Sequence, residues 1–277
     1  MKRMIESKNG VWYINSSSVE IIQTCKRKAK YALVDNLRKE DESDALTFGS
    51  AIHEALAAFY NSQRDYDYIC KIFENRAKPL AHLVDDKRSI ENGKKILKKY
   101  FEVYKDDPWT IFYDKDGPFV ERSFELKLND GIVVHGTIDC ILKNIETGEL
   151  VICDHKTTST IGSDFINRAN PNTQFTIYAW AANQLGIPVD RVMVNGIQVA
   201  KTKCDLARIF TARTKDHFEE MENIIIDSVH QMNINISSKR WPMNSGACSN
   251  WGGCQYLEIC QSVNAYKQVM IESLYGL

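Results

Sequence analysis

Residues 136–158, GTIDCILKNIETGELVICDHKTT, place two carboxylates and an ammonium group inside strand-like sequence. Apolar and β-branched runs stand on either side of a turn-forming segment centred near Gly148, which predicts a β-hairpin. With the turn centred there, we expect Asp139 opposite Lys156, and Asp154 diagonal to Asp139 on the same face, about 7–8 Å away. Unpaired carboxylates on a half-buried sheet face are costly because burial removes their hydration, so this hairpin needs a counterion.

Lys156 can neutralise only one of the two carboxylates. Oxygen ligands at this density suit Mg²⁺ or Mn²⁺, and the lysine then remains available to orient and activate a water molecule. The hairpin therefore predicts a hydrolytic metal site. The alternative is a partly exposed hairpin with a surface salt bridge, which is a common arrangement.

The composition is that of an ordinary globular protein. The chain has 277 residues, of which 44% are hydrophobic and 26% charged, which argues against disorder. Its net charge of −1 provides no overall field for nucleic acid, so such a partner would have to be bound by local patches. No apolar run approaches the roughly 18–20 residues that cross a bilayer, and the N-terminal segment lacks the apolar stretch of a secretion signal. We therefore expect a cytoplasmic protein without a membrane partner.

Periodic patterns divide the chain into a helical N-terminal half and a sheet-containing core. The predicted order of the core is three antiparallel strands, a crossover helix that ends at Gly186, and a fourth strand. This order predicts an α/β protein with a central mixed sheet flanked by helices, and α+β is the alternative. Helices are predicted over 16–33, 48–61, 64–105, 172–186 and about 214–236, and strands over 119–128, 132–142, 150–157 and 191–200.

We expect these elements to form a single domain. Its helical part covers about 1–107 and its sheet-containing core about 108–240. A cysteine-rich tail follows over 241–277 and is expected to be joined with Cys25.

Asp139 and the run Asp154-His155-Lys156 form a D...DxK pattern. Two further motifs accompany it in a fixed order: FGSAIHEAL on the helix that carries His53, and QFTIY on the crossover helix. Each motif alone is common by chance, but together they resemble the PD-(D/E)XK nuclease superfamily, in its RecB-type branch. That resemblance implies a restriction-endonuclease-like core.

The resemblance also implies a role for each matching residue. Asp139 and Asp154 would hold the metal together with the backbone carbonyl of His155, and His53 would add a nitrogen ligand. Lys156 would orient or deprotonate the attacking water. By strand alternation the His155 side chain is expected on the opposite face, so we assign it no role beyond its carbonyl.

Three further residues are candidates on the same grounds. Gln174 and Tyr178, one helical turn apart in QFTIY, match the QxxxY motif of this branch and would contact the substrate strand or brace the site. Glu121, on the strand before the first aspartate, is a candidate metal ligand; the alternative is an exposed strand glutamate. The usual proline ahead of the first aspartate is absent, and GTID stands in its place.

The tail carries a C-x5-C-x5-C array, CSNWGGCQYLEIC, formed by Cys248, Cys254 and Cys260. Structural zinc sites use closer pairs, with two to four intervening residues. Three local thiolates and a remote one suit a [4Fe-4S] cluster, and Cys25 is the candidate fourth ligand. This arrangement resembles iron–sulfur RecB-type nucleases such as the AddB nuclease domain and CRISPR-associated exonucleases, although their first interval is often shorter. The alternatives are Zn²⁺ and four ordinary thiols.

The remaining cysteines occur in helix or strand contexts. They are interpreted as small buried apolar residues. They are Cys70, Cys140, Cys153 and Cys204.

Two basic runs, KRKAK at 26–30 and KKILKK at 94–99, could contact DNA phosphates. The alternative for each run is the solvated face of an amphipathic helix. The candidate DNA-binding residues are Lys26, Arg27, Lys28, Lys94, Lys95 and Lys98.

The patterns and the resemblance together predict a metal-dependent DNA exonuclease acting on single-stranded or end-containing DNA in recombination, repair, or phage or mobile-element DNA processing. The chain has no G-x-x-x-x-G-K-[ST] sequence, so a helicase or recombination partner would have to supply ATP-driven unwinding. The alternatives are a structure-selective endonuclease acting on flaps or branches, and a catalytically silent DNA-binding subunit.

Overall fold

The computed structural model describes residues 5–8, 10–38, 43–61, 65–250 and 253–275. Its contacts divide the chain into two compact units, each assembled from separate stretches of sequence. The terminal unit comprises Met1–Asp41, Glu125–Gly136 and Glu219–Leu277, and the main unit comprises Glu42–Phe124 and Thr137–Phe218. Cys25 and the cysteine-rich tail both belong to the terminal unit. That both units form a single nuclease domain stays a prediction.

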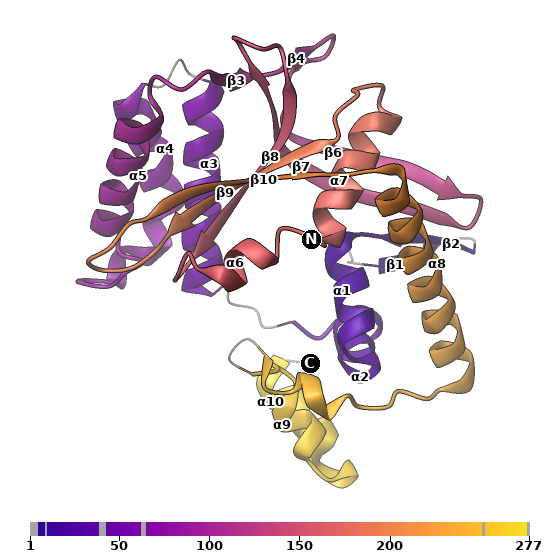
Figure 1. Cartoon of the computed structure of the whole chain (residues 1–277). Coiled ribbons are helices and arrows are strands. Elements are labelled where there is room, and N and C mark those ends of the chain that lie inside the picture. The colour runs from indigo at the N-terminus through magenta and orange to yellow at the C-terminus, as the bar shows by residue number, and fades with distance from the viewer. Residues whose placement is uncertain (1–4, 9, 39–42, 62–64, 251–252, 276–277) are drawn as a thin grey trace. The chain divides into compact units, whose positions relative to one another are not determined.

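Three neighbouring helices open the main unit: α3 (Asp44–Asn61), α4 (Tyr66–Arg76) and α5 (Ile90–Tyr104) (Figure 1). Side-chain caps fix where two of them begin, because Asp65 accepts a hydrogen bond from the backbone of α4 and Ser89 from that of α5. The helical prediction was correct for these segments. However, 64–105 is not continuous helix, because a 3-10 turn (Lys78–His82) and a loop separate α4 from α5.

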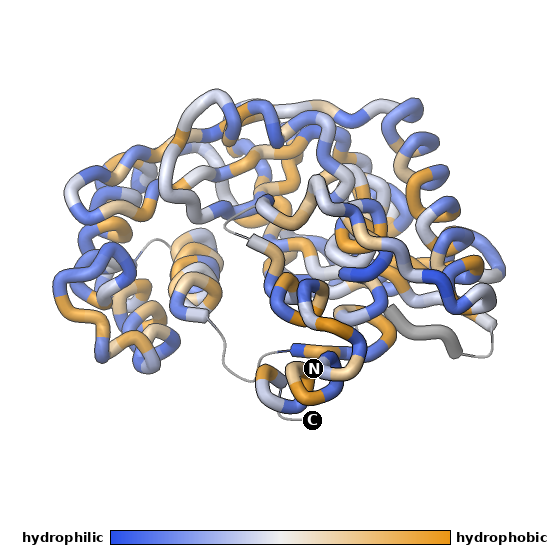
Figure 2. The backbone as a smooth tube through the Cα atoms, turned by 90° about the horizontal axis from the view of Figure 1, so that it is seen from below, coloured by the Kyte–Doolittle hydropathy of each residue, from blue (hydrophilic) through white to orange (hydrophobic). Residues whose placement is uncertain are grey.

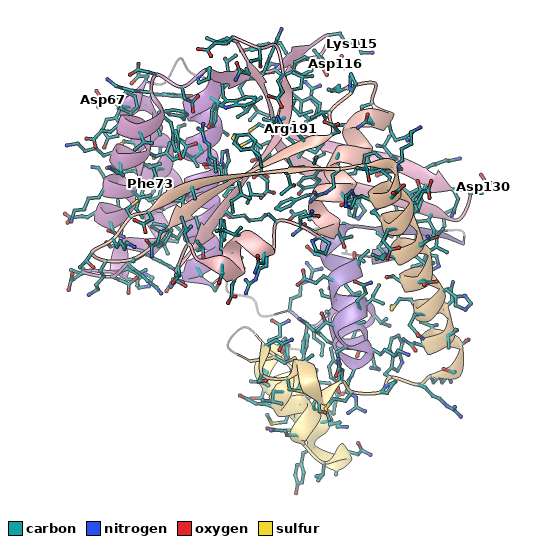
Figure 3. The ribbon with its side chains drawn as sticks, in the orientation of Figure 1. Asp67, Phe73, Lys115, Asp116, Asp130 and Arg191 are labelled. Carbon is teal, nitrogen blue, oxygen red and sulfur yellow. The ribbon has the colours of Figure 1, made fainter. Side chains whose placement is uncertain are left out.

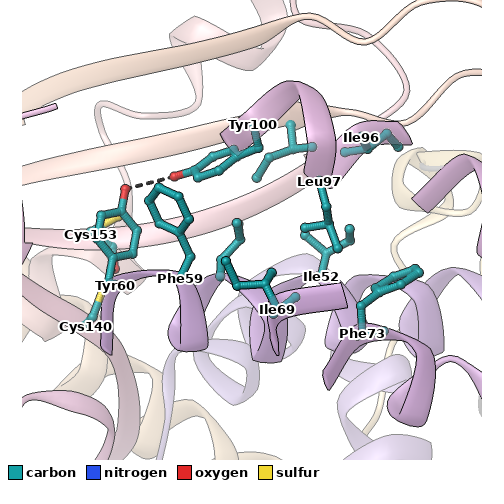
Figure 4. Packing of buried hydrophobic residues seen from close by; sticks show 14 of the residues in the cluster. Ile52, Phe59, Tyr60, Ile69, Phe73, Ile96, Leu97, Tyr100, Cys140 and Cys153 are labelled. Carbon is teal, nitrogen blue, oxygen red and sulfur yellow. Dashed lines mark hydrogen bonds between the residues drawn. The ribbon is translucent and has the colours of Figure 1, made fainter. Parts of the chain in front are cut away.

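The core of the main unit lies where α3, α4 and α5 meet the strands (Figure 4). Phe59 and Tyr100 pack edge to face, with ring centroids 5.2 Å apart. The helices α4 and α5 approach closely because Gly93 has no side chain: a Cβ there would lie 2.0 Å from the ring of Phe73, which is fully buried. The buried face of α5 therefore depends on that glycine.

The main unit carries a mixed sheet, as predicted. Its β7 (Ile132–Asn144) pairs antiparallel with β8 (Leu150–Thr158), β8 pairs parallel with β9 (Arg191–Gln198), and β9 pairs antiparallel with β10 (Leu206–Ala212). The strands β3 (Trp109–Ile111) and β6 (Val120–Asn129) also pair with β7. The strands β3 and β10 were not predicted.

The crossover between the parallel strands β8 and β9 contains α6 (Ser163–Asn167) and α7 (Thr173–Gln184). Asn172 caps the start of α7 by accepting a hydrogen bond from Phe175 N. Gly186 follows its end with φ +82°, which confirms the predicted C-terminal glycine. The helix α3 contacts β3 and β8, and α7 contacts β9.

A short hairpin, β4 (Tyr113–Asp114) and β5 (Gly117–Pro118), precedes β6. Its turn residues Lys115 and Asp116 are exposed (Figure 3). Figure 3 also marks Arg191 at the start of β9, which forms an ion pair with Glu149 in the turn between β7 and β8. This pair ties the turn to the neighbouring strand.

The register predicted for the β7–β8 hairpin was wrong. Cys140 pairs with Cys153, so the same register continued places Asp154, and not Lys156, opposite Asp139. The physical reason is the turn itself: Asn144 Oδ1 accepts hydrogen bonds from the backbone of Glu146 and Thr147, which shifts the turn centre toward the N-terminus. Directly opposite residues point to the same face, so the two carboxylates lie closer than the predicted diagonal pair would.

The terminal unit begins with two strands where helix was expected. The strand β1 (Ile5–Lys8) pairs with β2 (Val11–Ile14), which in turn pairs parallel with the segment of β7 that starts at Ile132. This correction has a non-local cause, because the pairing partner of β2 lies more than a hundred residues away. The helical pattern starts only at α1 (Ser16–Thr24), after a capping box at Asn15.

The other helices of the terminal unit include both predicted and unpredicted elements. The helix α2 (Lys26–Ala29) continues into a π-helical turn (Lys30–Val34), and α8 (Lys215–Ser238) matches the long helix expected near 214–236. The tail forms α9 (Leu257–Gln261) and α10 (Lys267–Tyr275). Along the helices, hydrophobic and hydrophilic residues alternate (Figure 2). None of the described helices combines the length and apolar character that crossing a membrane requires.

Candidate active site

The D...DxK residues meet at the junction of β7 and β8 in the main unit. Asp139 Oδ2 accepts a hydrogen bond of 3.0 Å from His155 N and lies 3.3 Å from His53 Nδ1 on α3. Burial acts to raise the pKa of Asp139, but the hydrogen bond from His53 and the positive charges of the two histidines outweigh it and lower the pKa to about 2. Asp139 is therefore held as a carboxylate.

Asp154 has the opposite electrostatic environment. Its side chain is completely buried, and burial, aided by the charge of Asp139, raises its pKa to about 6 although Lys156 acts in the other direction. Lys156 Nζ lies 2.8 Å from Asp154 Oδ2. Asp154 Oδ1 is buried and has no hydrogen-bond partner within the described residues. A buried oxygen without a protein partner is costly, so this position suits a cation ligand.

The ligand set fits a hard divalent cation. Ligand atoms of His53, Glu121 and Asp139 all lie within 4.8 Å of one another, and the partnerless oxygen of Asp154 adds a further carboxylate. One imidazole and several carboxylate oxygens are ligands that Mg²⁺ and Mn²⁺ accept. The predicted residues His53, Glu121 and Asp139 are thus brought together, and Asp154, which is not part of this group, lies opposite Asp139 by the hairpin register.

Glu121 has unusual backbone geometry. Its φ is +45°, which is rare for a residue with a side chain and is most often kept at functional positions. Although the residue is exposed, partial loss of hydration and the nearby charge of Asp139 raise the pKa of its carboxyl group. A bound cation would relieve this repulsion.

An open cleft of the main unit gives access to these residues. Besides His53, Glu121 and Lys156, it is lined by Gly49 and Ser50 of the FGSAIHEAL motif and by Glu54 and Arg76. Arg76, at the end of α4, is a cleft residue that the sequence did not single out. No motif or spacing marked it.

Gln174 and Tyr178 form a pair one turn apart on α7. Gln174 Nε2 donates a hydrogen bond of 2.8 Å to Tyr178 Oη. Tyr178 is buried, and burial together with the charge of Asp154 raises the pKa of its hydroxyl. On the same side, Lys156 Nζ lies 5.7 Å from the ring centroid of Phe175. Of the predicted QxxxY pair, Tyr178 therefore lies near enough to Asp154 for its hydroxyl to be affected by the charge of that carboxylate.

The His155 side chain points to the α3 side of β8, away from Asp154 and Lys156, as alternation predicted. Its ring stacks on Tyr60 at 6.0 Å and meets His53 edge to face at 5.8 Å. Its Nδ1 lies 2.9 Å from Asn195 Nδ2. The imidazole is almost fully buried.

Two cysteines stand beside His155 in the core. Ligand atoms of Cys140, Cys153 and His155 lie within 4.8 Å of one another, a group that could accept a soft metal ion. Both cysteines are almost fully buried and Cys70 is buried, in agreement with their interpretation as small core residues. Cys204 is only half-buried.

The four cysteines assigned to a cluster line one small pocket in the terminal unit. Asn244 connects its two ends: its backbone N–H donates to Cys25 Sγ at 3.4 Å, its side chain donates to Thr24 O at 2.9 Å, and its carbonyl accepts from Cys248 Sγ at 3.7 Å. The residues brought together are Cys25, Cys248, Cys254 and Cys260. Asn244 was not predicted from the sequence.

The spacing of these sulfurs is wide. In the described part of the chain, the groups of three or more potential ligands within 4.8 Å of one another include none of these four cysteines. A tetrahedral zinc ion, with Zn–S bonds of about 2.3 Å, needs sulfurs about 3.8 Å apart. The four sulfurs are therefore not gathered as closely as the ligands of a tetrahedral zinc ion.

The two basic runs have partners within their own units. In the terminal unit, Arg27 Nε donates to Trp241 O at 3.0 Å and Lys28 lines the cysteine pocket. In the main unit, Lys94 Nζ lies 2.6 Å from Glu74 Oε1. Lys95 and Lys98 are on the exposed face of α5. Contact with DNA by either run stays a prediction.

The mixed sheet carries paired carboxylates, a lysine and a histidine at its β7–β8 junction, a set of groups suited to hydrolysis. Comparison with known families agrees, because residues 13–261 match the model of the PD-(D/E)XK nuclease superfamily. The chain therefore belongs to the PD-(D/E)XK nuclease superfamily, and its sheet and flanking helices are the restriction-endonuclease-like fold of that family.

Solved structures support the fold. A protein of Eubacterium rectale provisionally named an exonuclease aligns with a TM-score of 0.53 at 13% identity, over 91% of this chain and 94% of that one. A second structure, SSO0001, aligns with a TM-score of 0.35 at 14% identity, over 77% of this chain and 84% of that one, which is too low to carry an argument. Among curated proteins, none matches the chain.

Proposed function

We propose that this protein is a Mg²⁺- or Mn²⁺-dependent deoxyribonuclease that degrades single-stranded or end-containing DNA as an exonuclease. The observation that carries the proposal is the meeting of His53, Glu121 and Asp139 within 4.8 Å, next to the ion pair between the buried Asp154 and Lys156. Membership of the superfamily supports nuclease action. The similar structure that is named an exonuclease supports cleavage from DNA ends.

Asp139, Asp154, His53 and the carbonyl of His155 would hold the ion, with Glu121 as a further ligand. When bound, the ion supplies charge neutralisation at the phosphate and makes water a better nucleophile at neutral pH. Asp139, already a carboxylate through its histidine contacts, keeps one side of the site charged at all ordinary pH values. Asp154 would lose its raised pKa once its free oxygen faces a cation.

Lys156 acts on the water and the phosphate. Its Nζ is fixed by Asp154 Oδ2 and by the face of Phe175, so the ammonium is aimed along the cleft that it lines. From there it orients the attacking water and stabilises the charge that develops on the phosphate oxygens. Gln174 and Tyr178 brace the same side, since their hydrogen bond stands beside Asp154.

The tail cysteines are proposed to hold a [4Fe-4S] cluster. The shared pocket and the wide sulfur spacing support this assignment over Zn²⁺. Cys25 and Cys260 belong to segments far apart in sequence, so the cluster would act by fastening the terminal unit. DNA contact by Lys98 and its neighbours, and unwinding by a separate helicase, remain part of the proposal.

Digestion of end-labelled linear and of circular single-stranded DNA, with Mg²⁺ or Mn²⁺, tests the function. Loss of linear but not circular DNA is expected, and Asp154→Ala should abolish it. Cutting of circles would instead identify an endonuclease. DNA binding without cleavage in either metal would identify a silent DNA-binding subunit and refute the nuclease.

A further inference from the structure

A chain of polar side chains crosses the apolar core of the main unit behind the proposed metal site. It begins with Arg208 on β10, which forms an ion pair with Asp107 and lies 3.7 Å from the centroid of the Tyr104 ring. Arg208 Nη2 donates a hydrogen bond of 2.9 Å to Tyr60 Oη. The guanidinium is thus held on three sides at the border of the core.

The chain continues through two tyrosines and an asparagine. Tyr60 Oη and Tyr100 Oη are 2.8 Å apart and hydrogen-bonded (Figure 4). Asn195 Nδ2 donates 2.7 Å to Tyr100 Oη and lies 2.9 Å from His155 Nδ1. Four elements, α3, α5, β9 and β10, therefore converge on one imidazole.

Asn195 is well placed to control His155. The two residues are register partners in the parallel pair β8–β9, and Asn195 has no exposed surface. His155 Nε2 is buried without a hydrogen-bond partner within the described residues, so the ring is oriented through Nδ1. When the imidazole is neutral, a hydrogen bond from Asn195 Nδ2 makes Nδ1 the acceptor and leaves the proton on Nε2.

Such a chain is expensive to keep in an apolar core. The surrounding cluster is made of aliphatic and aromatic residues, and phenylalanine or leucine at these positions would need no buried hydrogen bonds. Asn195 Oδ1 and Arg208 Nε have no hydrogen-bond partner within the described residues, but the hydrogen bonds that are made tie the imidazole to Tyr100 through Asn195 and restrict its motion. The rigid group here is the middle residue of D-H-K, whose N–H binds Asp139 and whose carbonyl is the proposed metal ligand.

We propose that Asn195 is a positioning residue for the metal site, and that Tyr100, Tyr60 and Arg208 extend its hold on His155 into the core. This inference rests on the proposed function. By holding the imidazole on one face of β8, Asn195 also restricts the His155 backbone, whose N–H and C=O lie in the plane of the sheet. The carbonyl is then presented to the cation without further ordering, while the N–H keeps its hydrogen bond to Asp139.

Mn²⁺ binding provides a test that does not depend on activity. The free ion is measured by electron paramagnetic resonance during titration of wild type, Asn195→Ala, Tyr100→Phe and the control Asn92→Ala. Asn92 is also buried in the main unit and also donates hydrogen bonds, to Lys87 O and Ala200 O. It does not belong to the hydrogen-bonded series that runs from Arg208 to His155. Asn195→Ala should weaken binding about tenfold, Tyr100→Phe in the same direction, and Asn92→Ala not at all.

Nitrogen-15 NMR of the His155 ring gives a second readout that needs no metal. Wild type should show the Nε2–H tautomer, and Asn195→Ala should lose that preference. Folded Asn195→Ala protein with wild-type Mn²⁺ affinity, or with an unchanged tautomer, overturns the inference. If Asn195→Ala does not fold, Tyr100→Phe decides by the same criteria, because it removes one hydroxyl and keeps the ring.

The outcome for the proposed function is separate. Wild-type Mn²⁺ binding that Asp139→Asn does not reduce would refute the metal site itself, whatever the Asn195 variants show. In DNA cleavage, the positioning role appears as a higher Mg²⁺ concentration for half-maximal rate in Asn195→Ala, with little change in rate at saturating Mg²⁺. A general loss of structure would instead also lower the cleavage rate at saturating Mg²⁺.

Discussion

The Asp139 carboxylate accepts a hydrogen bond of 3.0 Å from the backbone N–H of His155, which joins the two strands of the catalytic hairpin at their functional ends. The same carboxylate lies 3.3 Å from His53 Nδ1. Asp139 is therefore stabilised before any cation arrives, whereas Asp154, on the facing strand, is buried with one oxygen lacking a partner. The two carboxylates should respond to mutation in opposite ways.

Asp139→Asn is expected to destabilise the metal-free protein at neutral pH. The pKa of Asp139 is about 2 when folded, below its ordinary 3.8. Its stabilising contribution is fully present above pH of about 4 and is lost as the pH falls toward 2. The shift corresponds to about 2–3 kcal/mol of unfolding free energy at pH 7. Urea unfolding in the presence of a chelator measures it; equal stability of the two proteins at pH 7 would contradict the prediction.

Asp154→Asn is expected to stabilise the same metal-free protein. The pKa of Asp154 is about 6 when folded, above its ordinary 3.8, so the folded state loses stability as the pH rises from about 4 through 6. The free energy of unfolding of the asparagine variant should exceed that of wild type by on the order of 2 kcal/mol at pH 7.5, and the two should be equal near pH 4. The comparison is made by urea unfolding at both pH values. A variant less stable than wild type at pH 7.5 would show that Asp154 is not strained without a cation.

Mn²⁺ should raise the melting temperature of wild type by several degrees, since a ligand at about a hundred times its Kd adds about 2.7 kcal/mol. Differential scanning fluorimetry with and without chelator measures the shift. Asp154→Asn and His53→Ala should lose most of it, because each removes a proposed ligand. A shift that persists in both variants would place the bound ion elsewhere.

Lys156→Ala should separate cation binding from catalysis. The lysine is paired with Asp154 and lines the cleft, but it offers no ligand atom to a cation. We expect Mn²⁺ binding to remain and DNA cleavage to fall by at least about a hundredfold. Single-turnover cleavage and an Mn²⁺ titration are measured on the same preparation. Retained cleavage would remove Lys156 from the chemistry.

Anaerobically prepared protein is expected to be brown, with iron and sulfide bound to the pocket that Cys254 lines. Cys254→Ser should lose the colour and most of the iron, whereas Cys204→Ser, a half-buried cysteine outside that pocket, should keep both. Visible absorption and metal analysis provide the measurement. Colourless protein with stoichiometric zinc would refute the cluster.

Gly93→Ala should destabilise the helix pair α4–α5, because the new Cβ would overlap the buried Phe73 ring. Overpacking of this kind costs about 1–3 kcal/mol. Gly49→Ala on α3 is the matched control: its Cβ would be 3.5 Å from Thr157 Oγ1, an ordinary contact. Thermal unfolding should show a large drop only for Gly93→Ala.

Local patterns were sufficient for the elements that carry the site. The helix α7, with its cap at Asn172 and its glycine at Gly186, and the strand β8 around Asp154 were predictable because their signals lie within a few residues. His53 could be placed beside the carboxylates only through the family resemblance. The motif order carried information that periodicity did not.

Other features depend on partners distant in sequence. Strands β1 and β2 are four residues each, and β2 is stabilised by pairing with the distant β7. Their own sequence did not indicate strands, so they were assigned to the helical N-terminal part. The hairpin register was missed because the hydrogen bonds of the Asn144 side chain to the backbone of Glu146 and Thr147 place the turn earlier than a centre near Gly148 would. Arg208 and Tyr60 are separated by 148 positions, and no spacing rule could have joined them.

The turn at residues 145–149 makes the catalytic centre depend on chain length. Because successive side chains of β8 alternate between its two faces, one inserted residue in this link would move His155 to the face that Asp154 now occupies and Asp154 to the face beside α3. Substitutions at the exposed Ile145 or Glu146 do not change the number of residues in the turn. An unremarkable surface loop thus serves as the spacer that decides which residues of D-H-K face the substrate.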